Sequence, residues 1–332
     1  MSRSRRDVAL ALCCLALFVA PAVAHVPDFA GENDDPSHAY RVEDPATSRA
    51  VYDRLPAGEA RYYELHLDAG DRLRVSVYTP TAGPFTPSLV LASPALEAGE
   101  RVPEQVTLPD GYGAAVVPGE KPAGAAFEPF TPASYYYTVD VDRRVERSGT
   151  YLLAVYAPDR SAGAFGIAVG YEERFTPVEY LSVPLDVVGV HLWEGDGPLL
   201  VFGPLAATLL GGLALARRRL ARLDAERPAV RYAVATSGLL LAGTAAGTLV
   251  QLFLALARSG PVWSALLTLG FVLVPGALGA SLVRTALADE FALSWRTRAH
   301  LLVAAAGGFL AWGGLLVGPA LALAVATVPI RR

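Results

Sequence analysis

Four apolar segments occupy the carboxy-terminal part of this chain, and each is long enough to cross a lipid bilayer. A helix rises about 1.5 Å per residue, so about 20 residues span a hydrocarbon core of about 30 Å. No Asp, Glu, Lys or Arg lies in the middle of any segment. The segments are residues 197–216, 232–256, 262–283 and 300–327. The sequence therefore predicts an all-α bundle of four transmembrane helices over residues 197–332, with the lipid bilayer as its partner.

Arginines distinguish the two sides of this predicted bundle. The connection 217–231 carries six arginines and the connection 284–299 carries three, whereas the intervening 257–261 carries one. Positively charged loops remain on the cytoplasmic side of a membrane. We therefore expect a multi-pass protein of the cell membrane whose amino-terminal domain is extracytoplasmic.

The amino terminus independently predicts export. Three arginines precede an apolar run over residues 8–20, and Ala22-Val23-Ala24 follows as a small-x-small cleavage signal. These are the three parts of a secretory signal peptide, here residues 1–24. Cleavage would make His25 the new amino terminus. Both cysteines fall in the removed segment, so no disulfide and no cysteine-ligated metal is predicted in the mature chain.

The predicted outer part of the chain is acidic. Residues 25–196 contain 27 Asp and Glu against 13 Lys and Arg, a difference of −14, while residues 197–332 contain 4 against 12, a difference of +8. An acidic surface repels phosphate backbones and attracts cations or basic partners, so nucleic-acid binding is not expected. Solvation in a salty environment would explain the same charge without any ligand.

Short runs with alternating apolar residues fill residues 49–171, the pattern of antiparallel strands with one buried face. Residues 61–67 and 72–78 alternate in this way around a Gly-containing turn, which predicts a β-hairpin. Later runs of the same kind cover residues 135–141, 150–156 and 165–171. About seven such strands would form an all-β sandwich, jelly-roll-like, over residues 25–178.

Two parts of this region resemble a known family. The sequence LPAGEARYYEL at residues 55–65, followed by AGDRL at 69–73, resembles the opening hairpin of the pre-peptidase carboxy-terminal (PPC) type of β-sandwich. The sequences SGTYLLAV at 148–155 and GAFGIAV at 163–169 resemble its closing hairpin. The resemblance implies an accessory domain, here fused to a multi-span anchor, with a binding or stabilising role and no catalytic residues.

The middle of the region departs from that family pattern. Residues 79–134 contain ten prolines and six glycines, which interrupt strand ladders but leave room for a strand over residues 88–92. A long insertion of this kind is either functional or merely tolerated at the surface, and both interpretations stay open.

Residues 179–196 join the two predicted parts. This segment mixes apolar residues with Asp186 and His191 and ends at Trp193, next to acidic residues. Tryptophan beside a spanning helix is typical of the membrane interface, so we expect a juxtamembrane, interfacial segment. A last strand of the sandwich is the alternative.

Two candidate metal sites follow from the residue types. A freed amino group at His25 together with its imidazole could chelate copper, if another nitrogen ligand completed the site. The acidic loop of Glu32, Asp34 and Asp35 offers the oxygen ligands that calcium prefers, although it lacks the spacing of a calcium-binding loop. A solvated acidic turn is the alternative for that loop.

Pairs of glycines in the predicted helices suggest a helix contact. Gly243 and Gly247, and likewise Gly314 and Gly318, are spaced so that they lie on one helical stripe, which lets two backbones approach closely. We interpret these pairs as candidate surfaces for a homo-oligomer.

Sequence signatures of catalysis are missing. The chain contains no nucleophile elbow and no His-Glu-x-x-His motif, and no resident cofactor is predicted. We therefore expect a non-enzymatic, membrane-anchored binding or scaffold protein that displays an acidic β-sandwich, with another membrane or surface protein as a candidate partner. The alternative is a copper- or calcium-binding delivery component of a transport system.

Overall fold

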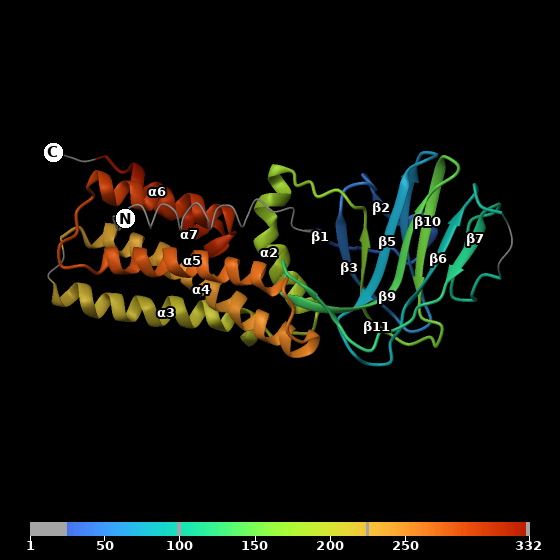
Figure 1. Ribbon diagram of the computed structural model, residues 1–332, viewed down its shortest axis with the longest axis horizontal. Helices are drawn as coiled ribbons and strands as arrows, with labels where there is room; N and C mark the ends of the chain where they lie inside the picture. The colour runs from blue at the N-terminus through green and yellow to red at the C-terminus, as the bar shows by residue number, and fades with distance from the viewer. Residues whose placement is uncertain (1–24, 98–100, 224–225, 330–332) are drawn as a thin grey trace. The chain divides into compact units, whose positions relative to one another are not determined.

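The computed structural model describes residues 25–97, 101–223 and 226–329, and the chain in it divides into two units (Figure 1). One unit contains the β-strands and helix α2 (Pro177–Trp193). The other contains helices α3 to α7 together with Pro129–Ala133. The predicted fold class, a β-sandwich followed by an all-α region, is confirmed. The predicted signal peptide, residues 1–24, lies outside the described residues.

The described part of the first unit contains eleven strands in two sheets, against the seven expected. In the six-stranded sheet A the order is β1 (Val26–Phe29), β3 (Arg49–Leu55), β11 (Gly163–Val169), β5 (Arg72–Thr79), β9 (Ala133–Arg144) and β8 (Ala126–Glu128). In the five-stranded sheet B it is β2 (Tyr40–Val42), β4 (Ala60–Leu67), β10 (Gly149–Tyr156), β6 (Ser88–Ser93) and β7 (Gly113–Val117).

The main core lies between the two sheets. Alternation along each strand sends one set of side chains inward, as Val75 and Val77 show in sheet A and Leu65 and Leu153 show in sheet B, all of them fully buried. Burying such side chains stabilises a fold by about 1.5–3 kcal/mol each. The apolar alternation that predicted the strands therefore marks this interface correctly.

The predicted hairpin of residues 61–67 and 72–78 is wrong in its pairing. Both strands exist, but β4 belongs to sheet B and pairs with β10, while β5 belongs to sheet A and pairs with β11 and β9. The turn between them carries the chain from one sheet to the other. Alternation cannot distinguish the two cases, because a strand needs one buried face in either arrangement.

The Pro-rich residues 79–134 contribute three strands. The expected strand at 88–92 is confirmed as β6, which is buried throughout and pairs with β10. β7 extends sheet B beyond β6, and β8 lies at the edge of sheet A. Part of the insertion is therefore a component of both sheets and not a surface loop.

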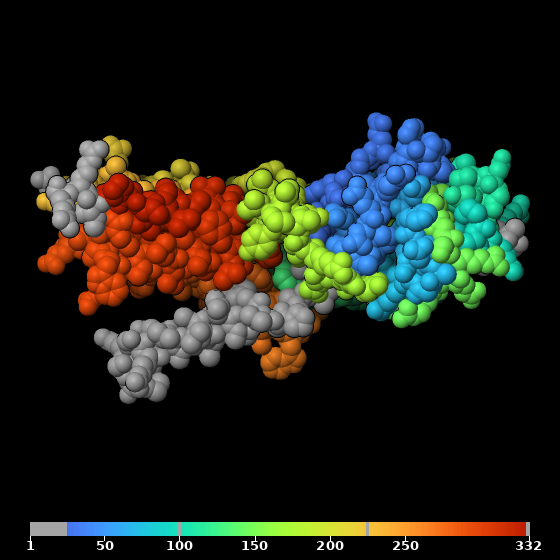
Figure 2. Space-filling model, turned by 90° about the horizontal axis from the view of Figure 1, so that it is seen from above, coloured from blue at the N-terminus to red at the C-terminus, as the bar shows by residue number. Residues whose placement is uncertain are grey.

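Helix α2 packs against the face of sheet A that points away from the main core. Its Trp193 ring lies 4.8 Å from the ring of Tyr52, centroid to centroid, and its indole nitrogen donates to the backbone oxygen of Asp53 at 2.7 Å. The rings of Tyr78 and Tyr135 also lie against Trp193. The space-filling view shows the yellow-green α2 in contact with the blue amino-terminal strands (Figure 2).

Residues 179–196, expected as an interfacial segment, are thus largely α2. Trp193 is buried, so it does not serve as an exposed aromatic anchor, and the alternative of a last strand is not met either. The helix begins with a capping box, in which Thr176 and Glu179 exchange hydrogen bonds. Glu179 also accepts from Arg49 of β3 at 2.9 Å, which fixes the first turn of α2 to sheet A.

In the described part of the helical unit, three helices are long and apolar enough to cross a membrane, or four if a bent pair counts as one span. The three are α3 (Pro198–Arg222), α4 (Pro228–Ser259) and α5 (Ala265–Ala286). The predicted fourth span at 300–327 is a pair bent by 117°, α6 (Trp295–Leu310) followed by a 3-10 turn (Gly313–Leu316) and α7 (Val317–Thr327). Left-handed backbone at Trp312, Leu315 and Leu316 produces the bend.

Three of the four glycines expected at an oligomer interface pack inside the chain. An added Cβ at Gly243 would lie 2.6 Å from Leu205 of α3, and Cβ atoms at Gly314 and Gly318 would meet Leu240 of α4 at 3.1 and 3.3 Å. At Gly247 a Cβ would meet none of the surrounding described atoms within 4 Å. The homo-oligomer stays a prediction. Of the four glycines, Gly247 is the one with no neighbouring described atoms in contact with an added Cβ.

We expect Gly166→Ala to destabilise the sandwich. Gly166 lies in β11 opposite Tyr78, and an added Cβ would lie only 2.3 Å from that ring, so the substitution should cost about 1–3 kcal/mol of unfolding free energy. The measurement is urea unfolding followed by the fluorescence of Trp193. The full-length protein carries Trp263→Phe, Trp295→Phe and Trp312→Phe, so that Trp193 is its one tryptophan.

The matched control is Gly31→Ala, because a Cβ there would meet none of the described atoms within 4 Å. Its effect should stay within about 0.5 kcal/mol. Equal unfolding midpoints for the Gly166→Ala and Gly31→Ala proteins would contradict the close packing of Tyr78 on Gly166.

Candidate functional site

A half-open pocket of about 450 Å³ lies on the outer face of sheet A. Its floor is formed by small residues of the central strands, among them Ser76 in β5 and Ala168 in β11. Small side chains on neighbouring strands leave space that large ones would fill. The size falls within the range of about 300–1,000 Å³ typical of small-molecule sites.

Charged side chains from β5 and β9 form one wall of this pocket. Arg74 pairs with Asp140, and Asp140 also accepts a hydrogen bond from Ser76 at 3.0 Å. A second carboxylate, that of Asp142, has an oxygen 3.9 Å from a guanidinium nitrogen of Arg74. These contacts hold the guanidinium and the Asp140 carboxylate in place at the edge of the floor.

His25 lies in the pocket at the start of β1. Its Nδ1 is 2.5 Å from the hydroxyl of Ser48, the residue just before β3. Burial, and next the nearby Arg74, lower the pKa of His25 from its ordinary value of 6.5 to about 4. The imidazole is therefore neutral at physiological pH, when it can donate one hydrogen bond and accept another.

The lining carries charged groups of both signs. It contains the carboxylates of Glu128, Asp140 and Glu173 and one guanidinium, that of Arg74. Burial raises the pKa of Tyr137, and the carboxylates of Glu128 and Asp140 raise it further, so its phenol stays protonated. An aromatic ring beside carboxylates is a combination that recognises cationic groups.

The residues predicted from sequence as metal ligands do not come together. His25 is in the pocket, whereas Glu32, Asp34 and Asp35 lie in the loop before the 3-10 turn Pro36–His38. Asp35 caps this turn by accepting from Ser37, and these hydrogen bonds lower the pKa of its carboxyl. Asp35 therefore has a structural role as the cap of this turn.

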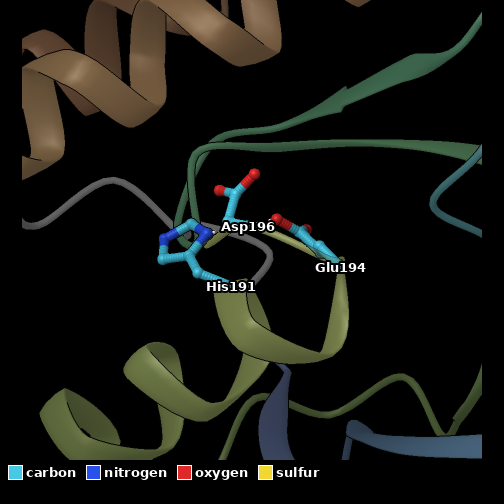
Figure 3. Close-up of side chains that lie close together, drawn as sticks. All are labelled: His191, Glu194 and Asp196. Carbon is cyan, nitrogen blue, oxygen red and sulfur yellow. Dashed lines mark hydrogen bonds and ion pairs between the residues drawn. The ribbon is translucent and has the colours of Figure 1, made fainter. Parts of the chain in front are cut away.

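A different group of three satisfies the geometry of a metal site. His191, Glu194 and Asp196 each place one ligand atom within 4.8 Å of the others, and they form the one such group of three among the described residues (Figure 3). From the sequence, His191 is assigned to the joining segment 179–196 and is not grouped with Glu194 and Asp196 as a metal site. A helical spacing of three between His191 and Glu194 was the signal that could have found the pair.

The wall of the pocket was also missed from sequence. Arg74 and Ser76 alternate with the buried Val75 and Val77, so their common face could have been assigned. The proximity of Arg74 and Ser76 to His25 could not be predicted from the sequence, because β11 and β3 lie between β5 and β1 in the sheet.

The chain matches no protein-family profile and no curated protein. The resemblance to the PPC type of β-sandwich stays a prediction.

We expect the sandwich to lose stability as the pH falls from about 6.5 to about 4, because His25 in the unfolded chain binds a proton in this range while the folded pocket keeps it neutral. The unfolded state then binds more protons, so acid favours it. The full shift corresponds to about 3 kcal/mol. Urea unfolding followed by Trp193 fluorescence measures the loss at each pH.

The control is His25→Asn, whose amide keeps a polar contact to Ser48 but does not titrate. Its stability should change less than that of the parent between these pH values. Identical pH profiles for the parent and His25→Asn would show that His25 is not held neutral.

Proposed function

We propose that this protein is a non-enzymatic, membrane-anchored binding protein that displays its acidic β-sandwich on the extracytoplasmic side and binds a cationic group in the pocket of His25 and Asp140. The observation that carries the proposal is the lining of this pocket, where the ring of Tyr137 lies near the carboxylates of Glu128 and Asp140. A scaffold role toward another membrane or surface protein is compatible with the same surface.

The anchor part of the proposal rests on the helical unit. Its long helices expose large apolar side chains, among them Leu210, Phe253 and Leu273, as expected for surfaces that face lipid. The arginine-rich connections 217–231 and 284–299 favour the cytoplasm for one end of the bundle. This orientation would place the sandwich outside, in agreement with the predicted signal peptide.

The cation part rests on charge and on the neutral histidine. A protonated His25 would cancel one of the carboxylates, but its pKa of about 4 keeps it uncharged at neutral pH. Arg74 is already engaged by Asp140 and Asp142. A ligand that brings a positive charge of its own would meet the ring of Tyr137, which lies near the carboxylates of Glu128 and Asp140.

The orientation predicts a labelling pattern. The predicted mature chain has no cysteine, so single cysteines report on topology in a parent carrying Cys13→Ala and Cys14→Ala. Glu146→Cys, in the exposed loop after β9, should react with a membrane-impermeant maleimide in intact cells. Arg218→Cys, at the end of α3, should react only after the membrane is opened. The reverse pattern would contradict the extracytoplasmic display.

The pocket predicts selective binding of positive charge. Choline should bind the purified full-length protein, whereas its uncharged carbon isostere should not, and Glu128→Gln should weaken choline binding about ten-fold, or about 1.4 kcal/mol. Titration calorimetry or ligand-observed NMR provides the measurement. Glu104→Gln is the control, since that side chain is 93% exposed and outside the pocket. Equal binding of choline and its isostere, or no saturable binding of either, would rule out the proposed cation site.

A further inference from the structure

The carboxyl end of α2 places three metal-ligating side chains next to one another. His191 lies in the last turn, Glu194 is the C-cap residue, and Gly195 follows with a φ of +98°. This left-handed backbone, which glycine adopts without strain, turns the chain so that Asp196 reaches the same place. The three side chains come from six consecutive residues and converge in Figure 3.

The cluster is shielded from solvent. The exposed fractions of the side chains are 7% for His191, 3% for Glu194 and 7% for Asp196. His191 Nδ1 is 3.1 Å from Glu194 Oε2, so the nitrogen already faces a carboxylate. Groups held in this way lose little freedom when they bind an ion, which favours affinity.

One carboxylate oxygen in the cluster is left without a partner. Within the described part of the chain, Glu194 Oε1 is buried and accepts no hydrogen bond. The hydroxyl of Tyr135 lies near Glu194, and this carboxylate adds to the effect of burial in raising the pKa of the tyrosine. An unsatisfied buried acceptor costs about 1–3 kcal/mol, and more when it is charged, so a bound cation would remove an existing penalty.

The charge of the cluster also favours a cation. Two carboxylates are buried at the end of a helix, where the backbone dipole contributes further negative potential. Among the described residues, Arg258 pairs with Asp196, with 3.8 Å between a guanidinium nitrogen and a carboxylate oxygen. The Arg258 side chain is 41% exposed. One guanidinium therefore accompanies the two buried carboxylates.

The ligand types select among metals. One imidazole nitrogen and two carboxylate oxygens suit a first-row divalent transition metal, whereas Ca²⁺ and Mg²⁺ prefer sites made of oxygen alone. Zinc accepts His, Asp and Glu in a tetrahedral arrangement, and sites with three protein ligands keep a fourth position for water. The geometry points to a zinc-type divalent metal site formed by His191 Nδ1 and one oxygen each of Glu194 and Asp196.

This site is separate from the cation pocket of His25 and from the copper and calcium sites expected from sequence. No residue of His191, Glu194 and Asp196 lines that pocket. When bound, the metal would hold the last turn of α2 and the two residues after it in one conformation.

Zinc titration of the full-length protein tests the proposal. The protein is purified in detergent, stripped with a chelator and titrated with Zn²⁺ alone in competition with a chromophoric zinc indicator. About one equivalent should bind saturably, and His191→Ala should weaken binding by at least about ten-fold, since loss of even an outer-sphere partner costs that much. Excess Ca²⁺ or Mg²⁺ should not displace the zinc.

Two further variants separate metal binding from folding. His66→Ala removes an exposed histidine elsewhere in the sandwich and should leave zinc affinity unchanged. Glu194→Gln preserves the shape of the side chain, so it should fold, as judged by Trp193 fluorescence, and still lose zinc affinity. X-ray absorption at the zinc edge of the parent should show a single imidazole. No saturable binding, or equal binding by the parent, His191→Ala and Glu194→Gln, would overturn the assignment.

Discussion

Burial of sheet A on both of its faces is the constraint on which the rest of the sandwich unit depends. One face packs against sheet B through aliphatic side chains, and part of the other packs against α2 through an aromatic cluster around Trp193. A sheet with two buried faces cannot have polar residues alternating along its whole length. Tyrosines satisfy this condition, since their rings tolerate burial while their hydroxyls still seek polar partners.

The partial coverage by α2 divides the outer face of sheet A into two parts. Under the helix the tyrosines fill the space, and Gly166 in the central strand leaves room for the ring of Tyr78. Farther along the same strands the residues become small and charged, and that part forms the pocket of His25 and Asp140. The end of α2 brings His191 and Glu194 down onto the sandwich, where Glu194 is buried near Tyr135. Both candidate sites therefore follow from how one helix covers one sheet.

The helical unit follows a different physical requirement. Its helices satisfy their backbone hydrogen bonds internally and expose apolar side chains, which is the solution available to a chain in hydrocarbon. Close contacts are made by glycine: Cβ atoms at Gly238 and Gly279 would lie 2.6 and 2.4 Å from a backbone oxygen of the facing helix. The glycines that suggested self-association largely serve this packing within the chain. The break before α7 is held by Thr244 of α4, whose hydroxyl accepts from the Gly314 nitrogen at 2.9 Å.

The sequence by itself determined the fold class, the boundary between the two units near Asp196, most strand positions and three of the helices long enough to span. Local periodicity and segment length carry this information, because each strand or helix must bury its own apolar face. Only the tertiary structure decided which strands pair, that residues 177–193 form a helix against sheet A, and that His25 shares a pocket with Arg74. These relations join residues far apart in the chain, and one sequence has no local signal for them. His191, Glu194 and Asp196 are close in sequence, but their convergence requires the helix to end at Glu194 and the left-handed turn at Gly195, and the burial that leaves a Glu194 oxygen unpaired comes from the sandwich beneath it.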